Sequence, residues 1–200
     1  MNVVGKYITI KPGDYQDYRK FSKIAASWEK KAVDKCEELR KKGIGGIELD
    51  LFDSCQSISK NLSKYFQEPN YSLDDEVYVC KDNEENVQGF LTFFTAGNYF
   101  CITALLTNPE NIGSSLNLEP IRGVGHVLLG YAERRAVVLK KEWIKVFPLP
   151  SAEPFYKRRG YVKYFTDKRG YMHHFFPHLI KTTEKIQEEI GTMLKINVIL

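Results

Sequence analysis

Arg122-Gly123-Val124-Gly125-His126-Val127 is the stretch that decides the expected fold, because it puts two glycines where an apolar helical pattern begins. Glycine lacks a side chain, so the backbone N–H groups of such a turn can close on a phosphate. The helix N-terminus adds unpaired donors and a partial positive charge. The stretch therefore predicts an anion-binding turn, and a plain turn ahead of a helix is the alternative reading.

Three phosphate-binding patterns compete for this turn. The dinucleotide fingerprint needs a glycine at position 128, which is Leu128, and the P-loop needs Gly-Lys-Ser/Thr, which the chain lacks. The remaining pattern is Arg122-x-x-Gly125-x-Val127, and it resembles motif A of the GNAT N-acetyltransferase superfamily, Gln/Arg-x-x-Gly-x-Gly/Ala. Arg122 and Gly125 match that pattern, whereas Val127 replaces its small last residue.

The resemblance implies acetyl-CoA as acyl donor, with no metal. It implies a diphosphate site made of Arg122, Gly123, Val124, Gly125, His126 and Val127. The strand Tyr99 to Thr107, followed by Asn108-Pro109, resembles the strand that precedes motif A in the family. That strand is bulged in the family, so the resemblance also implies that the backbone of Leu105, Leu106 and Thr107 binds the acetyl carbonyl and the pantetheine arm.

A second segment resembles motif B of the same family, Ala-x-x-x-Tyr-x-x-x-Gly-Phe. It carries Ala152, Tyr156 and Gly160, with Tyr161 in place of the phenylalanine. The resemblance implies that Tyr156 is the general acid that protonates the departing thiolate, since a phenol has a reference pKa near 10. It also implies that Lys157 and Arg158 reach the ribose phosphate. A packing role for Tyr156 is the alternative.

Hydrophobic periodicity and turn residues predict the remaining elements. The expected strands are Tyr7–Lys11, Glu76–Lys81, Val87–Thr95, Tyr99–Thr107, Trp143–Phe147, Tyr161–Thr166 and Tyr171–Phe176. The expected helices are Asp14 to Gly43, Glu48–Phe66, Val124–Lys141, Ala152–Arg159 and His178–Lys195. In the helix after the glycine turn, the expected apolar face consists of Val127, Leu128, Tyr131, Ala132, Ala136 and Leu139.

The order of these elements predicts an α/β (α+β) protein of GNAT-like type. Its central sheet is expected to be mixed and mostly antiparallel, with helices on both faces and extra helices at both ends. We expect one domain over residues 1–200, made of an N-terminal strand and helical region (1–70), a coenzyme-binding core (76–176) and a C-terminal helix (178–200). The terminal helices are expected to cover the acceptor site or to form a homodimer interface.

Composition and charge argue against several other classes of protein. The net charge of +4 is too small to indicate nucleic-acid binding, and the basic run from Lys140 to Arg169 contains no nucleic-acid reading motif. The four cysteines form no Cys-x-x-Cys pair, and no histidine has zinc-ligand spacing, so buried thiols in a reducing compartment are expected. The chain shows no signal peptide and no stretch of about 20 apolar residues, which predicts a cytoplasmic protein without membrane contact.

The acceptor is expected to be a primary amine on a small molecule or a protein, attacked in a ternary complex. Residue type alone makes Glu110, Glu119, His173 and His174 candidates for the base that takes the amine proton. The alternative function is a catalytically weak or inactive GNAT-like domain that binds acyl-CoA or mediates protein contacts.

Overall fold

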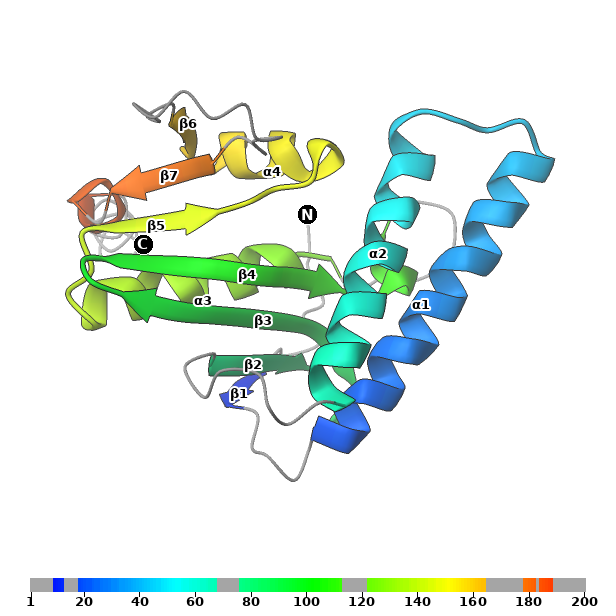
Figure 1. Ribbon diagram of the computed structural model, residues 1–200, viewed down its shortest axis with the longest axis horizontal. Coiled ribbons are helices and arrows are strands. Elements are labelled where there is room, and N and C mark those ends of the chain that lie inside the picture. The colour runs from blue at the N-terminus through cyan, green and yellow to red at the C-terminus, as the bar shows by residue number, and fades with distance from the viewer. Residues whose placement is uncertain are drawn as a thin grey trace, which may run out of the picture. The chain divides into compact units, whose positions relative to one another are not determined.

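The computed structural model describes residues 9–12, 18–67, 76–112, 122–164, 178–182 and 184–188 (Figure 1). The elements follow in the order β1 (Thr9–Pro12), α1 (Tyr18–Lys41), α2 (Ile47–Gln67), β2 (Glu76–Lys81), β3 (Val87–Ala96), β4 (Tyr99–Thr107), η2 (Pro109–Asn111), α3 (Val124–Val138), β5 (Trp143–Val146), η3 (Pro150–Ala152), α4 (Glu153–Arg158), β6 (Val162–Tyr164) and β7 (His178–Thr182).

The strands of the described part form one sheet in the order β1-β2-β3-β4-β5-β7-β6. By residue contacts the chain divides into two compact units, one of residues 1–92 and 104–129 and the other of residues 93–103 and 130–200. We call them the first and second unit, and the single domain expected from the sequence stays a prediction. The strands β3 and β4 and the helix α3 contribute residues to both.

In the first unit, α1 and α2 lie side by side and are joined by the turn at residues 42–46 (Figure 1). Their apolar positions recur every three or four residues, so each helix presents one apolar stripe. The stripe of α1 contributes Phe21, Ala25, Trp28, Ala32, Cys36 and Leu39 to the core, and that of α2 contributes Phe52, Cys55, Leu62 and Phe66. Both helices confirm the sequence prediction.

Phe90 of β3 is the centre of this core. Its ring centroid lies 5.1 Å from that of Trp28, 5.6 Å from that of Phe21 and 5.4 Å from that of Phe66. Burying an aromatic side chain of this size stabilises a fold by roughly 1.5–3 kcal/mol. Phe90 therefore ties the helix pair to the strands of the first unit.

The β2–β3 turn is organised by Asp82, which is buried at 4% exposure. Its Oδ1 accepts hydrogen bonds from the backbone N–H groups of Glu84 and Asn86, and its Oδ2 accepts one from Nε2 of Gln88 at 2.8 Å. Burial by itself would raise the pKa of Asp82. These hydrogen bonds outweigh burial and lower it below its usual value.

In the second unit, β5 pairs with β4 and β7. The strands β4 and β5 are parallel, with Tyr99 opposite Trp143 and Ile102 opposite Val146. The strand β7 is antiparallel to both β5 and β6. One parallel pair among antiparallel ones confirms the predicted mixed, mostly antiparallel sheet.

The C-terminal region corrects the sequence prediction. Residues His178–Thr182 form the strand β7, not the start of a helix, and helical structure is described only for residues 184–188. Two neighbouring strands satisfy the backbone of this segment, and its β-branched residues Ile180 and Thr182 favour a strand. Oγ1 of Thr182 accepts a hydrogen bond from the Lys185 N–H at 3.4 Å, and so caps the helical turn that follows. The predicted strand at residues 171–176 lies outside the described residues.

The helix α3 also differs in part from its prediction. Leu128, Ala132 and Ala136 are fully buried as expected, whereas Val127, Tyr131 and Leu139 are only half-buried. The buried side of α3 instead includes Val124, Leu129 and Glu133. A glutamate on that side is unexpected from periodicity, and its partners are described with the candidate site.

All four cysteines are buried free thiols. Burial raises the pKa values of Cys36, Cys55 and Cys80 to about 12. Within the described ranges, no group of three or more His, Cys, Asp and Glu side chains could hold a metal ion. The helices that the structure describes include none long and apolar enough to cross a membrane.

Candidate active site

The glycine turn opens α3 at the surface of the first unit. Gly123 has a φ of 86°, in the left-handed region that favours glycine. Its carbonyl oxygen accepts the first helical hydrogen bond, from the N–H of Val127 at 3.0 Å. The N–H groups of Val124, Gly125 and His126 therefore precede the helical hydrogen-bond ladder, as the first N–H groups of a helix do. Arg122, Gly123 and His126 are exposed at this turn.

Gly89 of β3 sets how closely this helix approaches the sheet. A Cβ atom at residue 89 would lie 2.7 Å from Cδ1 of Leu128, 2.8 Å from Cγ1 of Val124 and 3.0 Å from the carbonyl oxygen of Leu106. Any side chain there would displace the Leu128 and Val124 side chains of α3 or crowd the backbone of β4 at Leu106. The next residue, Phe90, packs against α1 and α2, and successive strand residues point to opposite faces. The α1–α2 pair and the start of α3 therefore cover opposite faces of the first unit's strands.

The end of β4 holds the predicted acyl-binding residues. Leu106 is buried at 4% exposure and belongs to the core of the first unit, whereas Leu105 and Thr107 are half-buried. The N–H of Asn108 donates to the Gln88 carbonyl at 2.9 Å, so β4 stays paired with β3 to its end. On its other edge, the register with β5 stops at Ile102 and Val146. Leu105, Leu106 and Thr107 thus continue past the described pairing with β5.

Tyr156 lies in the second unit, on the short helix α4. It is 5% exposed, and its ring meets Phe155 and Tyr161 edge-on, with centroids 5.1 and 5.6 Å away. Burial raises the pKa of the phenol above its usual value, so the hydroxyl keeps its proton at physiological pH. The helix ends before Gly160, whose φ of 79° confirms the predicted helix-ending glycine.

The predicted phosphate-binding side chains of α4 are accessible. Lys157 and Arg158 are exposed, and Nζ of Lys157 lies 3.7 Å from a carboxylate oxygen of Glu153, one helical turn earlier. Lys157 is exposed and Glu153 is half-buried, and a single ion pair at this distance leaves the lysine able to exchange partners.

A buried ionic cluster fixes the chain just after α4. The Glu133 carboxylate accepts from Nη2 of Arg159 at 2.7 Å and from Nζ of Lys181 at 3.4 Å, and Lys181 also donates to the Arg159 carbonyl at 2.8 Å. Lys181 is 1% exposed and its Nζ lies 5.8 Å from the centre of the Tyr161 ring. The Tyr161 ring contacts the Tyr156 ring, so Tyr161 connects this ionic cluster to Tyr156.

Gly89 and this ionic cluster are site-supporting features that sequence reasoning missed. A lone glycine inside an apolar strand often marks a close backbone approach, and this signal could have found Gly89. No sequence signal joins Glu133, Arg159 and Lys181, because α3, the end of α4 and β7 meet only in the folded chain.

Among the candidate bases, the structure describes only Glu110, which follows β4 in η2. Its Oε1 accepts a hydrogen bond from Nζ of Lys31 of α1 at 2.5 Å, and both side chains are more than two-fifths exposed. The other three candidates, Glu119, His173 and His174, lie outside the described residues.

No protein-family profile and no curated protein sequence matches this chain. Solved structures do. The PaiA N-acetyltransferase of Thermoplasma acidophilum, solved in complex with coenzyme A, is 15% identical over 88% of this chain and 99% of its own, with a TM-score of 0.53.

Two further solved structures resemble this chain about as much. A GNAT-family acetyltransferase of Staphylococcus aureus is 14% identical over 88% of this chain and 99% of its own, with a TM-score of 0.52. The dodecameric spermidine N-acetyltransferase of Vibrio cholerae is 12% identical over 90% of this chain and 95% of its own, with a TM-score of 0.53. The chain therefore has the fold of the GNAT N-acetyltransferases.

Proposed function

We propose that this protein transfers an acetyl group from acetyl-CoA to a primary amine. The observation that carries the proposal is the exposed glycine turn at the N-terminus of α3, seated against Gly89. A 15-residue helix with an open N-terminus is a ready-made anion site, and a diphosphate is a ligand of that class. The likeness of the fold to acetyltransferases, one of them in complex with coenzyme A, supports the same ligand.

In this proposal the backbone N–H groups of Gly123, Val124, Gly125 and His126 bind the diphosphate. The partial positive charge at the start of α3, roughly half a unit charge, strengthens those hydrogen bonds. Arg122 adds a charged side chain at the turn, and Val127 borders the same site. Lys157 and Arg158 bind the ribose phosphate.

The backbone N–H groups at the end of β4 receive the charge that develops on the acetyl carbonyl oxygen. Donors of Leu105, Leu106 and Thr107 do this best when no strand occupies that edge, which agrees with the end of the described β4–β5 register at Ile102. The amine nitrogen forms the new bond to the carbonyl carbon, and the carbon–sulfur bond breaks. Tyr156 supplies the proton that the sulfur takes up, and the amine proton passes to water or to a base such as Glu110.

The acceptor is a primary amine of a small molecule or of a protein. Spermidine is the amine named for the Vibrio cholerae neighbour, so polyamines belong in the first acceptor panel beside amino acids and peptides. We expect the protein to act in the cytoplasm, without nucleic-acid or membrane partners, and a homodimer stays a prediction.

Binding of acetyl-CoA is the first test. A ligand at one hundred times its dissociation constant stabilises the folded state by about 2.7 kcal/mol, so thermal unfolding should shift clearly. The absence of any shift at millimolar acetyl-CoA would overturn the proposal and leave a domain that has the fold without the ligand.

The role of Tyr156 has its own test. We expect Tyr156→Phe to lose most turnover while its acetyl-CoA dissociation constant stays unchanged, because only the hydroxyl is removed. Tyr78→Phe is a matched control, since Tyr78 is also a buried tyrosine at 8% exposure and its hydroxyl donates to Glu76 at 3.0 Å. Equal turnover of the two variants would show that Tyr156 has a packing role.

A further inference from the structure

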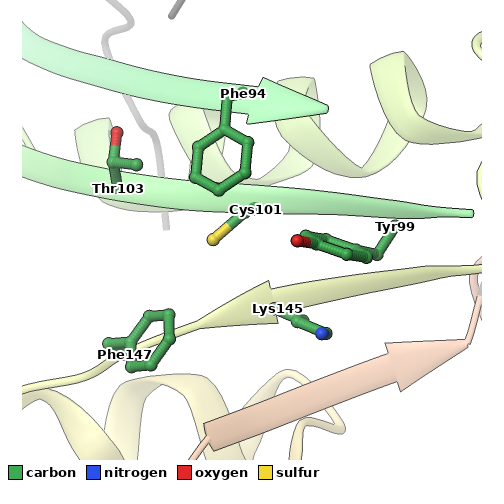
Figure 2. A pocket seen from close by; sticks show the side chains of 6 residues that line it. All are labelled: Phe94, Tyr99, Cys101, Thr103, Lys145 and Phe147. Carbon is green, nitrogen blue, oxygen red and sulfur yellow. The ribbon is translucent and has the colours of Figure 1, made fainter. Parts of the chain in front are cut away.

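A pocket of about 280 Å³ opens on one face of the strands in the second unit. Figure 2 shows its side chains coming from β3, β4, β5 and the residue just after β5, with Phe94 and Phe147 on either side of Cys101. The six lining residues are Phe94, Tyr99, Cys101, Thr103, Lys145 and Phe147. The acyl-transfer proposal uses none of them.

The strand pattern explains why this face is hollow. Tyr99, Cys101 and Thr103 alternate along β4 and therefore point the same way, and Lys145 is the register partner of Cys101 on β5. The residues between them, Phe100, Ile102, Ile144 and Val146, are at most 3% exposed and form the core of the second unit. By contrast Phe147 is 49% exposed, and Phe94, Tyr99 and Lys145 are half-buried. One face is packed, and the other carries the partly exposed aromatic rings that line the pocket.

Lys145 gives this pocket its charge. Its Nζ lies 3.8 Å from the centre of the Tyr99 ring and 4.9 Å from that of Trp143, a geometry in which ring faces attract a cation. In the part of the chain that the structure describes, Lys145 has no carboxylate within ion-pair distance. None of the six lining residues is acidic.

Trp143, the more distant of the two rings beside this ammonium group, is fixed by a hydrogen bond. Nε1 of Trp143 donates to Oδ1 of Asn98 at 3.0 Å, and Nδ2 of Asn98 donates to Glu142 at 2.7 Å. Nζ of Lys141 donates to the Gly97 carbonyl at 2.8 Å. The β3–β4 turn is thus connected to the residues that enter β5, and these bonds fix the Trp143 ring beside Lys145.

We propose that this pocket binds a small aromatic carboxylate, with its ring between Phe94 and Phe147 and its carboxylate on Lys145. Phe94 meets Tyr99 edge-on at 6.3 Å, which makes the aromatic wall continuous. The Tyr99 hydroxyl has no hydrogen-bond partner among the described residues and provides a second donor for the carboxylate. A cationic ligand would meet the like charge of Lys145, and a neutral one would leave that charge uncompensated.

The pocket volume limits the size of this ligand. Binding sites for drug-sized molecules begin at about 300 Å³, and a cavity of about 150 Å³ already holds benzene. A single ring with one carboxylate therefore fits 280 Å³. This inference does not depend on acetyl transfer, because the pocket can be tested by binding alone.

The fluorescence of Trp143, which lies beside Lys145, can follow a titration of the protein with benzoate. We expect benzoate to bind more tightly than benzamide, its neutral analogue, and more tightly than spermidine. Lys145→Met should weaken benzoate binding by about tenfold or more, since it removes a hydrogen bond from a charged group, and should not weaken benzamide binding. Lys60→Met, which removes an exposed lysine from α2, is the control and should bind benzoate as the unaltered protein does.

Three results would overturn the inference: no benzoate binding, equal affinity for benzoate and benzamide, or tighter binding of spermidine. Phe147→Ala tests the aromatic wall independently and should weaken the binding of benzoate and of benzamide to a similar extent. Circular dichroism and thermal unfolding of each variant establish that it is folded, so that a loss of binding is assigned to the pocket.

Discussion

Gly89 of β3 and Val124 of α3 lie so close together that a Cβ atom at residue 89 would come within 2.8 Å of the valine Cγ1. The first turn of α3, which carries the proposed diphosphate site, therefore rests directly on a strand backbone. The same glycine meets the Leu106 carbonyl, so strand and helix are positioned by one residue.

Gly89→Ala should destabilise the protein by about 1–3 kcal/mol, the usual cost of overpacking a core. It should also weaken acetyl-CoA binding, because the Val124 and Leu128 side chains that seat the start of α3 on β3 must shift. Urea unfolding and a binding titration measure the two effects. Gly45→Ala is the control, since its Cβ would meet nothing within 4 Å and its stability should change by less than about 0.5 kcal/mol. An unchanged stability of Gly89→Ala would contradict the close contact.

Gly123→Ala should weaken acetyl-CoA binding. Its φ of 86° costs a residue with a Cβ about 1–2 kcal/mol, so the alanine variant relaxes toward another backbone and loses the aligned N–H groups. Gly43→Ala is closely matched, because Gly43 also has a positive φ, 68°, with open space around its Cβ. The two variants should lose similar stability, and only Gly123→Ala should lose affinity. Equal affinity would argue against the turn as the coenzyme site.

Glu133→Gln should lower the free energy of unfolding by about 3–5 kcal/mol, since it leaves the Lys181 ammonium buried without its counter-charge. In the double variant Glu133→Gln/Lys181→Met the buried charge is gone, so part of the loss should be recovered. A double-mutant cycle from urea unfolding measures the coupling between the two residues. Strict additivity of the two single changes would mean that the 3.4 Å contact carries no energy.

Acid should destabilise the protein in part through Asp82. Its pKa is lowered in the folded state, so it contributes stability above its unfolded pKa of about 3.9, and that contribution is lost as the pH falls through the folded value. Asp82→Asn should lower the free energy of unfolding by about 1–3 kcal/mol at pH 7. The difference in the free energy of unfolding between the unaltered protein and Asp82→Asn should then narrow below about pH 4. A difference that is constant from pH 7 to pH 3 would contradict this assignment.

Local patterns were enough to predict most of the fold. Glu76–Lys81 and Tyr99–Thr107 were predicted to the residue, because polar turn residues bound each apolar run. The end of α4 was predicted from Gly160, whose left-handed φ follows from local chemistry alone. These features depend on residues close in sequence.

The failures share a long-range cause. His178–Thr182 becomes a strand because β5 and β6 offer hydrogen bonds on both sides, and neither neighbour can be read from the segment itself. Glu133 points inward because Arg159 and Lys181 neutralise it there, 26 and 48 residues away along the chain. The turn at residues 122–127 and the start of α3 were predicted from their own glycines, and their diphosphate role stays a prediction. Gly89 beneath that turn was missed, since only tertiary contact shows what a side chain there would meet.

The buried cysteines decide how activity can be followed in the laboratory. Colorimetric disulfide reagents react with thiolates, and at pH 8 a thiol whose pKa is about 12 contains almost none. Cys36, Cys55 and Cys80 should therefore stay silent in an assay that counts the free coenzyme thiol released at each turnover. Cys101 differs from these three because it borders the pocket of Figure 2. Slow labelling of Cys101 would report whether a ligand fills that pocket.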